Sequence, residues 1–218
     1  MKESPEKINR GNVIKVVLVG DKNVGKTSII NRFNKDEFVE EYSATIGIDL
    51  VTKSIKYGNG KVKVQLWDTA GQERFRCLIP SYIKKAEVVI AVYDITNPKT
   101  FNELSYWIDE VNKNKVVDVM MVIVGNKLDL TEKRQVTTDE GIKFAKNHNS
   151  TFAEVSAKTG ENIGKVFDQI IGALLKLEPE QVAIPPQPAG VSLQPSLHVP
   201  SANPDQQKSV RSKHCCKA

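Results

Sequence analysis

Short apolar segments alternate along the chain with segments that carry apolar residues at helical spacing. The first apolar segment is dense in β-branched side chains and short enough for a buried parallel strand. Three later segments are also expected to be strands, giving residues 13–19, 88–93, 120–124 and 151–155. Residues 46–57 and 61–67 are expected to pair as a hairpin around Gly-Asn-Gly, and the second of them has apolar residues at alternate positions. Helices are expected over residues 26–34 and from Pro98, Thr137 and Ile163 onward.

This order of elements predicts an α/β fold. One antiparallel hairpin in an otherwise alternating strand-helix order implies a six-stranded, mostly parallel sheet with helices on both faces. Loops at the carboxyl ends of the strands then form the ligand site. We expect a flexible N-terminus over residues 1–12 and one folded domain over residues 13–177. A disordered tail is expected over residues 178–218, because residues 178–204 are rich in Pro, Gln, Ser and Ala without periodicity.

Composition limits the classes of function. The chain carries a net charge of +5 that is spread over the domain and the tail, so nucleic acid is not an expected partner. No segment approaches the roughly 20 apolar residues of a membrane span. The first residues lack the apolar core of a secretion signal. We therefore expect a cytosolic protein that does not depend on disulfides.

Residues 20–27, Gly-Asp-Lys-Asn-Val-Gly-Lys-Thr, resemble a phosphate-binding loop between a strand and a helix. Gly20 and Gly25 would let successive backbone N–H groups point at phosphate oxygens, and the helix beginning at Lys26 would add its positive dipole end. Lys26 would reach the β- and γ-phosphates, and the Thr27 hydroxyl would bind Mg²⁺. The expected phosphate-binding set also contains Asn23, Val24 and Ser28. The alternative is a glycine-rich turn that matches by chance.

A second motif, Asp68-Thr-Ala-Gly71-Gln72, follows the expected strand over residues 61–67. Asp68 would face the Mg²⁺ through a water molecule. Gly71 has no side chain, so its N–H could approach a γ-phosphate closely, and Gln72 could orient an attacking water. The alternative is an Asx turn followed by a solvated glutamine.

A third motif, Asn126-Lys127-Leu-Asp129, follows the expected strand over residues 120–124. A carboxylate in the base plane accepts hydrogen bonds from both N1–H and N2–H₂ of guanine, whereas adenine offers an acceptor at N1 and nothing at C2. A buried polar site left unpaired can discriminate by about 10⁴ or more. The alternative is a solvated loop. Together the three motifs indicate binding of GTP and GDP with Mg²⁺.

With these motifs, the chain resembles a Ras-superfamily small GTPase of the Rab branch from about residue 13 to about residue 177. The fold implied is a P-loop small G domain. Three further strings resemble the first switch, the second switch and the last base-contacting loop: residues 44–49, 67–75 and 156–158. Residues 92–96 are typical of Rabs. Residues 78–83 and Arg134-Gln-Val136 look most like the Golgi-associated subgroup.

The resemblance implies roles for matching positions. Thr45 would close over Mg²⁺ in the GTP state, and Phe38 and Lys127 would contact two sides of the base. The Ala157 N–H would contact guanine O6, and three more nucleotide-binding residues are implied: Tyr42, Ser156 and Lys158. An aromatic triad read by effectors falls at Leu50, Trp67 and Tyr82. Leu50 departs from the usual Phe, and half-buried packing is the alternative for the other two.

The resemblance implies a switch that hydrolyses GTP and regulates vesicle traffic at the cytosolic face of the Golgi. Implied partners are an exchange factor, an activating protein, a GDP dissociation inhibitor and effectors that bind the switches. One alternative is a nucleotide-gated effector-binding module that hydrolyses too slowly to reset itself. Another is a metabolic P-loop kinase, for which the sequence lacks a lid and an acceptor site.

Three cysteines and one lysine carry further hypotheses. Cys215 and Cys216 resemble the paired ending of Rabs that are prenylated on both thiols, which would anchor the chain to a membrane. The alternative is two idle cysteines. Cys77 could be redox-active or a plain small residue. Lys22, which lies where the family often has a small or neutral side chain, could stabilise transition-state charge, crowd Gln72, or point to solvent.

Overall fold

The computed structural model describes residues 13–40, 45–57, 60–71, 79–116 and 118–175. Its strands are β1 (Val13–Val19), β2 (Ile48–Tyr57), β3 (Gly60–Thr69), β4 (Val88–Asp94), β5 (Met120–Asn126) and β6 (Thr151–Glu154). Its helices are α1 (Lys26–Lys35), α2 (Ile79–Ile83), α3 (Pro98–Asn102), α4 (Leu104–Asn114), α5 (Thr138–Asn147), α6 (Ile163–Leu174) and the 3₁₀ helix η2 (Leu128–Lys133).

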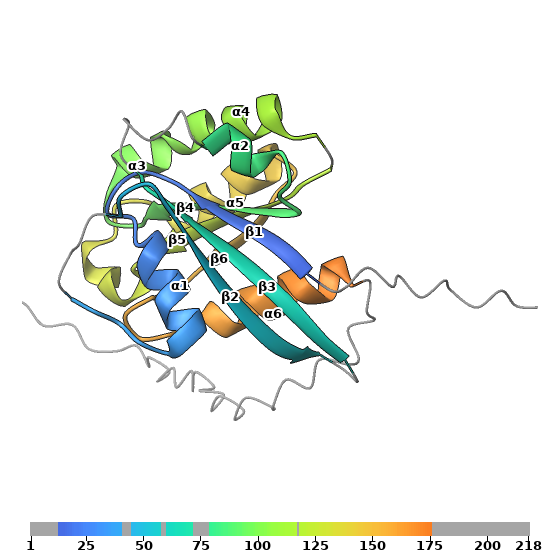
Figure 1. Ribbon diagram of the computed structural model, residues 1–218. Coiled ribbons are helices and arrows are strands. Elements are labelled where there is room, and N and C mark those ends of the chain that lie inside the picture. Colours follow the sequence, from blue (N-terminus) through green and yellow to red (C-terminus); the bar gives the residue numbers. More distant parts are fainter. Residues whose placement is uncertain (1–12, 41–44, 58–59, 72–78, 117, 176–218) are drawn as a thin grey trace, which may run out of the picture. The chain divides into compact units, whose positions relative to one another are not determined.

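The strands form one six-stranded sheet in the described part of the chain, in the order β2-β3-β1-β4-β5-β6. β2 and β3 are antiparallel, and the other neighbours are parallel. The expected mostly parallel six-stranded sheet is therefore confirmed. Parallel order brings the carboxyl ends of β1, β3, β4, β5 and β6 to one edge, where the loops that follow them meet (Figure 1).

Helices cover both faces of the sheet, α1 and α6 on one and α2, α3, α4 and α5 on the other (Figure 1). Side chains of β1 alternate between the two cores: residues 14, 16 and 18 pack toward α1 and α6, and residues 17 and 19 toward α2 and α4. Every residue of β4 is buried, as its apolar pattern predicts for a central parallel strand. A sheet buried on both sides is a rigid support for the loops at its edge.

The strand boundaries differ from the expected ones by one or two residues. The observed ends that differ are the starts of β2 and β3 at Ile48 and Gly60 and the ends of β3, β4, β5 and β6 at Thr69, Asp94, Asn126 and Glu154. Asp68 is a ladder residue because β2 pairs with β3 as far as Ile48 and Thr69. Gly125 is likewise a strand residue that pairs with Tyr93 and does not open the following turn. Polar residues therefore continue three strands, β3, β4 and β5, that the apolar pattern alone would end.

Helix boundaries also differ. The helix expected from Pro98 is two helices that meet at Glu103, and the one expected from Thr137 begins one residue later. Thr137 is its N-cap, in a reciprocal capping box with Glu140. α1 extends by one residue to Lys35. The apolar pattern of the sequence does not predict α2 or η2.

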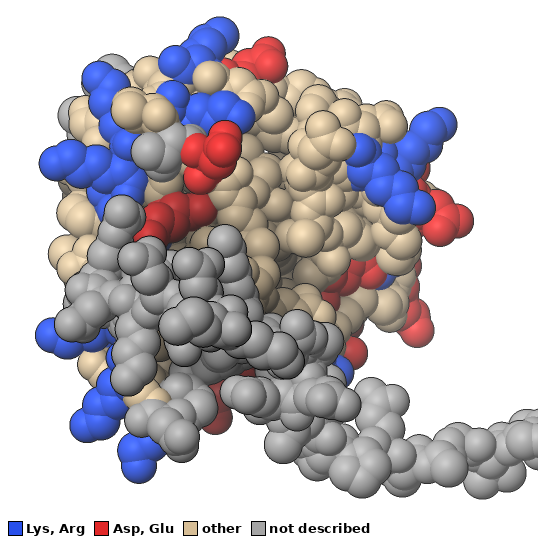
Figure 2. Space-filling view, turned by 90° about the vertical axis from the view of Figure 1, so that its right-hand side faces the viewer, with Lys and Arg blue, Asp and Glu red and all other residues tan. Residues whose placement is uncertain are grey.

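Charged side chains of both signs lie on the domain surface. On the face shown in Figure 2, the Lys and Arg side chains of the described residues stand in separate groups with acidic side chains near them. Among the residues that can be described, no helix is both long enough and apolar enough to span a bilayer. The N-terminal segment 1–12 and the tail 178–218 lie outside the described residues.

Candidate functional site

A cavity of about 810 Å³ lies at the edge where the parallel strands end. Its wall is built from loops that are far apart in the sequence. The predicted site residues that line it are Asn23, Gly25, Lys26, Thr27, Ser28, Phe38, Thr45, Gly71, Asn126, Lys127, Asp129, Ala157 and Lys158. The fold therefore brings the three motifs and the last loop together around one space.

The phosphate loop connects β1 to the first turn of α1. Gly25 is the N-cap residue with φ 91°, and α1 has no side-chain cap there, so the first N–H groups of the helix remain available to an anion. A Cβ at Gly25 would lie 2.3 Å from Asn126 Nδ2, which excludes any side chain. Lys26 is buried and donates to the carbonyls of Gly20 (3.0 Å) and Asp21 (2.8 Å). Burial lowers the pKa of its ammonium to about 8.

Three side-chain oxygens converge beside the phosphate loop. Thr27 Oγ1 lies 2.5 Å from Asp68 Oδ2 and 2.8 Å from Thr45 Oγ1, and Thr45 Oγ1 lies 3.5 Å from Asp68 Oδ2. The second oxygen of Asp68, Oδ1, is buried and has no hydrogen-bond partner among the residues that the structure describes. Burial raises the pKa of this carboxyl, opposed by the Thr27 hydrogen bond and the charge of Lys26. A carboxylate and two hydroxyls fit a small, hard cation such as Mg²⁺, whose remaining ligands would be phosphate and water.

Gly71 packs closely against the backbone of the phosphate loop. A Cβ at this buried position would lie 2.6 Å from Asp21 C, Asp21 O and Lys22 N. Real Cβ atoms essentially never come this close to other atoms, and all three neighbours are backbone. Only glycine therefore lets the chain after β3 touch the loop.

Asn126 joins the phosphate loop to the other end of the cavity. Its side chain is buried, donates from Nδ2 to Val24 O (2.8 Å) and accepts at Oδ1 from Ala157 N (3.1 Å). The family resemblance implies that the Ala157 N–H contacts guanine O6. In the structure this N–H donates to Asn126, and the contact with the base stays a prediction.

The Asp129 carboxylate is oriented by a hydrogen bond from a residue that does not line the cavity. Ser156 is fully buried and donates from Oγ to Asp129 Oδ1 (2.6 Å), while its own Oγ accepts from Thr159 N (3.0 Å). Ser156 was predicted among the residues that contact nucleotide, but it does not line the cavity. Its observed place is behind the carboxylate, which it orients.

Two ion pairs at the base end were missed from the sequence. Lys127 has a positive φ of 71° and lies 2.6 Å from Asp94, which is buried at the end of β4. Lys158 lies 2.9 Å from Glu40, and both are exposed, so this pair contributes little to stability. Asp94 lies in the string of residues 92–96, which could have drawn attention to it. Nothing in the sequence around Glu40 indicates that it pairs with Lys158.

The proposed effector surface is also brought together. Leu50 pairs with Trp67 across β2 and β3, and the Trp67 and Tyr82 rings lie 4.9 Å apart. Leu50 is 42 % exposed, whereas Trp67 and Tyr82 are half-buried. The ammonium of Lys15, a residue outside the predicted triad, lies 4.5 Å from the Trp67 ring centre. Both the packing role and the recognition role remain open for the aromatic pair.

Some predicted residues take other positions. Three predicted residues are buried and do not line the cavity: Gly20, Val24 and Asp68. Lys22 lines it and is exposed, so its three alternatives stay open. The remaining predicted residues lie outside the described ones: Tyr42, Gln72, Cys77, Cys215 and Cys216.

A comparison with models of known protein families gives a match to the Ras family over residues 15–176. This match spans well over half of the 218 residues. It includes every loop that contributes to the cavity.

Proposed function

The chain belongs to the Ras family of small GTPases, and from this premise we propose that it is a switch of the Rab branch that regulates vesicle traffic. Members of the family bind GTP and GDP with Mg²⁺, hydrolyse GTP, and interact with exchange factors, activating proteins and effectors. We propose further that this chain acts at the cytosolic face of the Golgi, anchored through lipids on Cys215 and Cys216. A GDP dissociation inhibitor would then hold its cytosolic pool.

The observation that carries the nucleotide assignment is the placement of Asp129. Ser156 fixes its carboxylate on the wall of a cavity that the phosphate loop also lines. A fixed carboxylate selects a base that offers two adjacent donors, which guanine does and adenine does not. This arrangement supports guanine nucleotides over adenine nucleotides and gives no support to the metabolic kinase alternative.

The chemistry follows from the groups around the phosphate end. Lys26 and the first N–H groups of α1 would bind the phosphates, and Thr27, Thr45 and Asp68 would hold Mg²⁺. When bound, the metal ion supplies positive charge that offsets the charge on the β- and γ-phosphate oxygens. Gln72 would orient the attacking water. Because the site supplies positioning and electrostatic stabilisation, its rate depends on the loops closing correctly.

The Rab assignment is supported by strings in the sequence and by one surface. Residues 92–96, 78–83 and 134–136 are typical of that branch or of its Golgi-associated subgroup. The pairing of Leu50 with Trp67 across β2 and β3, together with the ring contact between Trp67 and Tyr82, supports an effector surface. Localisation of a tagged chain against a Golgi marker tests the compartment, and a different compartment would overturn it.

The central test uses the purified full chain. Nucleotide released by denaturation should be GDP or GTP by chromatography, and unlabelled GDP should displace labelled GDP far better than ADP does. Single-turnover GTP hydrolysis with and without a Rab-directed activating protein then separates a self-resetting switch from the slow-module alternative. Comparable affinity for GDP and ADP would contradict the proposed function.

A further inference from the structure

Two segments form the guanine-reading end of the cavity, the loop of residues 126–129 and the loop of residues 156–158. Hydrogen bonds join them directly: Leu128 N to Val155 O (3.0 Å), Ser156 Oγ to Asp129 Oδ1 (2.6 Å) and Ala157 N to Asn126 Oδ1 (3.1 Å). The position of Asp129 relative to the rest of the cavity therefore depends on how these two segments are held.

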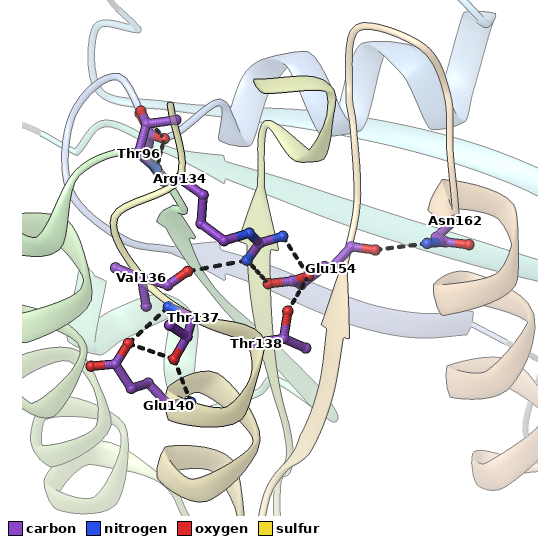
Figure 3. A network of polar contacts seen from close by, with 9 residues as sticks. Thr96, Arg134, Val136, Thr137, Thr138, Glu140, Glu154 and Asn162 are labelled. Atoms are coloured by element: carbon purple, nitrogen blue, oxygen red, sulfur yellow. Dashed lines mark hydrogen bonds and ion pairs between the residues drawn. The ribbon is translucent and has the colours of Figure 1, made fainter. Parts of the chain in front are cut away.

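Behind them, an ion pair joins the same two segments a second time. Arg134 follows η2, the helix that contains Asp129, and Glu154 ends β6, just before Ser156. The Arg134 guanidinium donates to both carboxylate oxygens of Glu154, at 2.6 Å and 3.0 Å (Figure 3). A fork of this kind fixes orientation as well as distance.

Both residues of the ion pair make further hydrogen bonds that fix their positions. Arg134 also donates to Val136 O (3.1 Å), while the carbonyl oxygen of Ile95, the residue that follows β4, accepts from Val136 N (3.0 Å). On the other side, Thr138 at the start of α5 donates to the Glu154 carboxylate (3.1 Å), and Asn162 donates to the Glu154 carbonyl (3.0 Å) (Figure 3). The pair thus connects η2, α5 and β6 to the central strand.

The pair lies largely out of solvent. The Arg134 side chain is 20 % exposed and the Glu154 side chain 10 %. Truncation of one partner would leave the other charge partly buried and unpaired. This lowers the stability of the folded state far more than loss of an exposed ion pair does. The two segments would then move until the remaining charge reached water or another partner.

We propose that Arg134 and Glu154 are a positioning pair that holds the two guanine-reading segments in register and so controls how long a guanine nucleotide stays bound. Neither side chain lines the cavity, and both act through Asp129 and the Ser156 loop. The inference rests on the proposed function. It also gives the Arg134-Gln-Val136 string a physical role, separate from the phosphate end and from hydrolysis.

Release of a fluorescent GDP into excess unlabelled GDP measures this role. Arg134→Met and Glu154→Gln should each accelerate release by about tenfold or more, since tenfold corresponds to only 1.4 kcal/mol. The double variant should release no faster than the faster single variant, because it leaves no charge unpaired. Preference for GDP over inosine diphosphate, which lacks the 2-amino donor, should fall in the single variants.

Thr137→Ala is the matched control for general destabilisation. It removes the N-cap of α5 next to the pair and should lower the thermal midpoint while leaving GDP release and base preference unchanged. Single-turnover hydrolysis of bound GTP should change less than twofold in Arg134→Met. If Arg134→Met does not fold, Arg134→Lys, which keeps the charge and loses the fork, should show the same changes at smaller size.

The outcomes separate the two proposals. Arg134 variants that lose thermal stability as Thr137→Ala does, yet release GDP at the unmutated rate with unchanged base preference, would overturn the positioning role. Failure of the unmutated chain to bind GDP would instead overturn the proposed function.

Discussion

Substitution of Gly71 by alanine should separate the segment after β3 from the phosphate loop. The added Cβ would lie 2.6 Å from three backbone atoms of Asp21 and Lys22, closer than the 3.0 Å below which something must shift. No flexible side chain can move aside, so the two segments must part by several tenths of an ångström. Overpacking of a tight contact costs about 1–3 kcal/mol.

This cost should fall more heavily on the GTP state. Gly71 is expected to approach the γ-phosphate through its N–H, and a displaced segment cannot do so. We expect Gly71→Ala to weaken binding of a non-hydrolysable GTP analogue relative to GDP by about fivefold to 150-fold, which is the same 1–3 kcal/mol. Competition against fluorescent GDP gives the two affinities, and thermal unfolding in saturating GDP gives the remaining loss of stability.

Gly164→Ala in α6 is the matched control. A Cβ there meets no atom within 4 Å, so the substitution should be neutral or stabilise the domain by about 0.5–1 kcal/mol without changing either affinity. If Gly71→Ala behaves like Gly164→Ala in both assays, the contact between the second switch and the phosphate loop does not constrain the protein.

Four further variants test the remaining assignments. Asp129→Asn should shift preference from guanine toward xanthine nucleotides, whose C2 oxygen accepts from the new amide, and unchanged preference in competition assays would refute the base reader. Gln72→Leu should slow intrinsic hydrolysis and spare binding. Lys22→Gln should raise intrinsic hydrolysis if the lysine crowds the water, whereas a change under about twofold, roughly 0.4 kcal/mol, supports the solvent-pointing alternative. Serine at both Cys215 and Cys216 should release the protein from membranes on cell fractionation without loss of GDP binding, and continued pelleting would refute the lipid anchor.

The sheet was predictable because its strands depend on apolar runs that need little tertiary information. Their ends were less predictable. Asp68 and Thr69 read as loop residues, yet both are buried in the ladder, where the Thr69 hydroxyl donates to Leu18 O (2.6 Å). The break between α3 and α4 falls at Glu103, where no Gly or Pro marks it.

The site was predictable as far as local motifs reach. A phosphate loop and a base-reading string show their chemistry within a few residues of sequence. The partners that hold these groups in place lie far away along the chain, such as Glu40, which is 118 residues from Lys158. No periodicity or spacing indicates such pairs, because only the fold brings them together.

The buried amide of Asn126 has a consequence for how the protein can change over evolution. It hydrogen-bonds to Val24 in the phosphate loop and to Ala157 in the loop of residues 156–158. One side chain therefore supports both phosphate recognition and base recognition. A substitution at Asp129, which lines the cavity, can change the base preference without affecting the phosphate loop. A change at Asn126 would disturb phosphate and base recognition together, so a lineage could acquire a new base specificity stepwise only by leaving this amide intact.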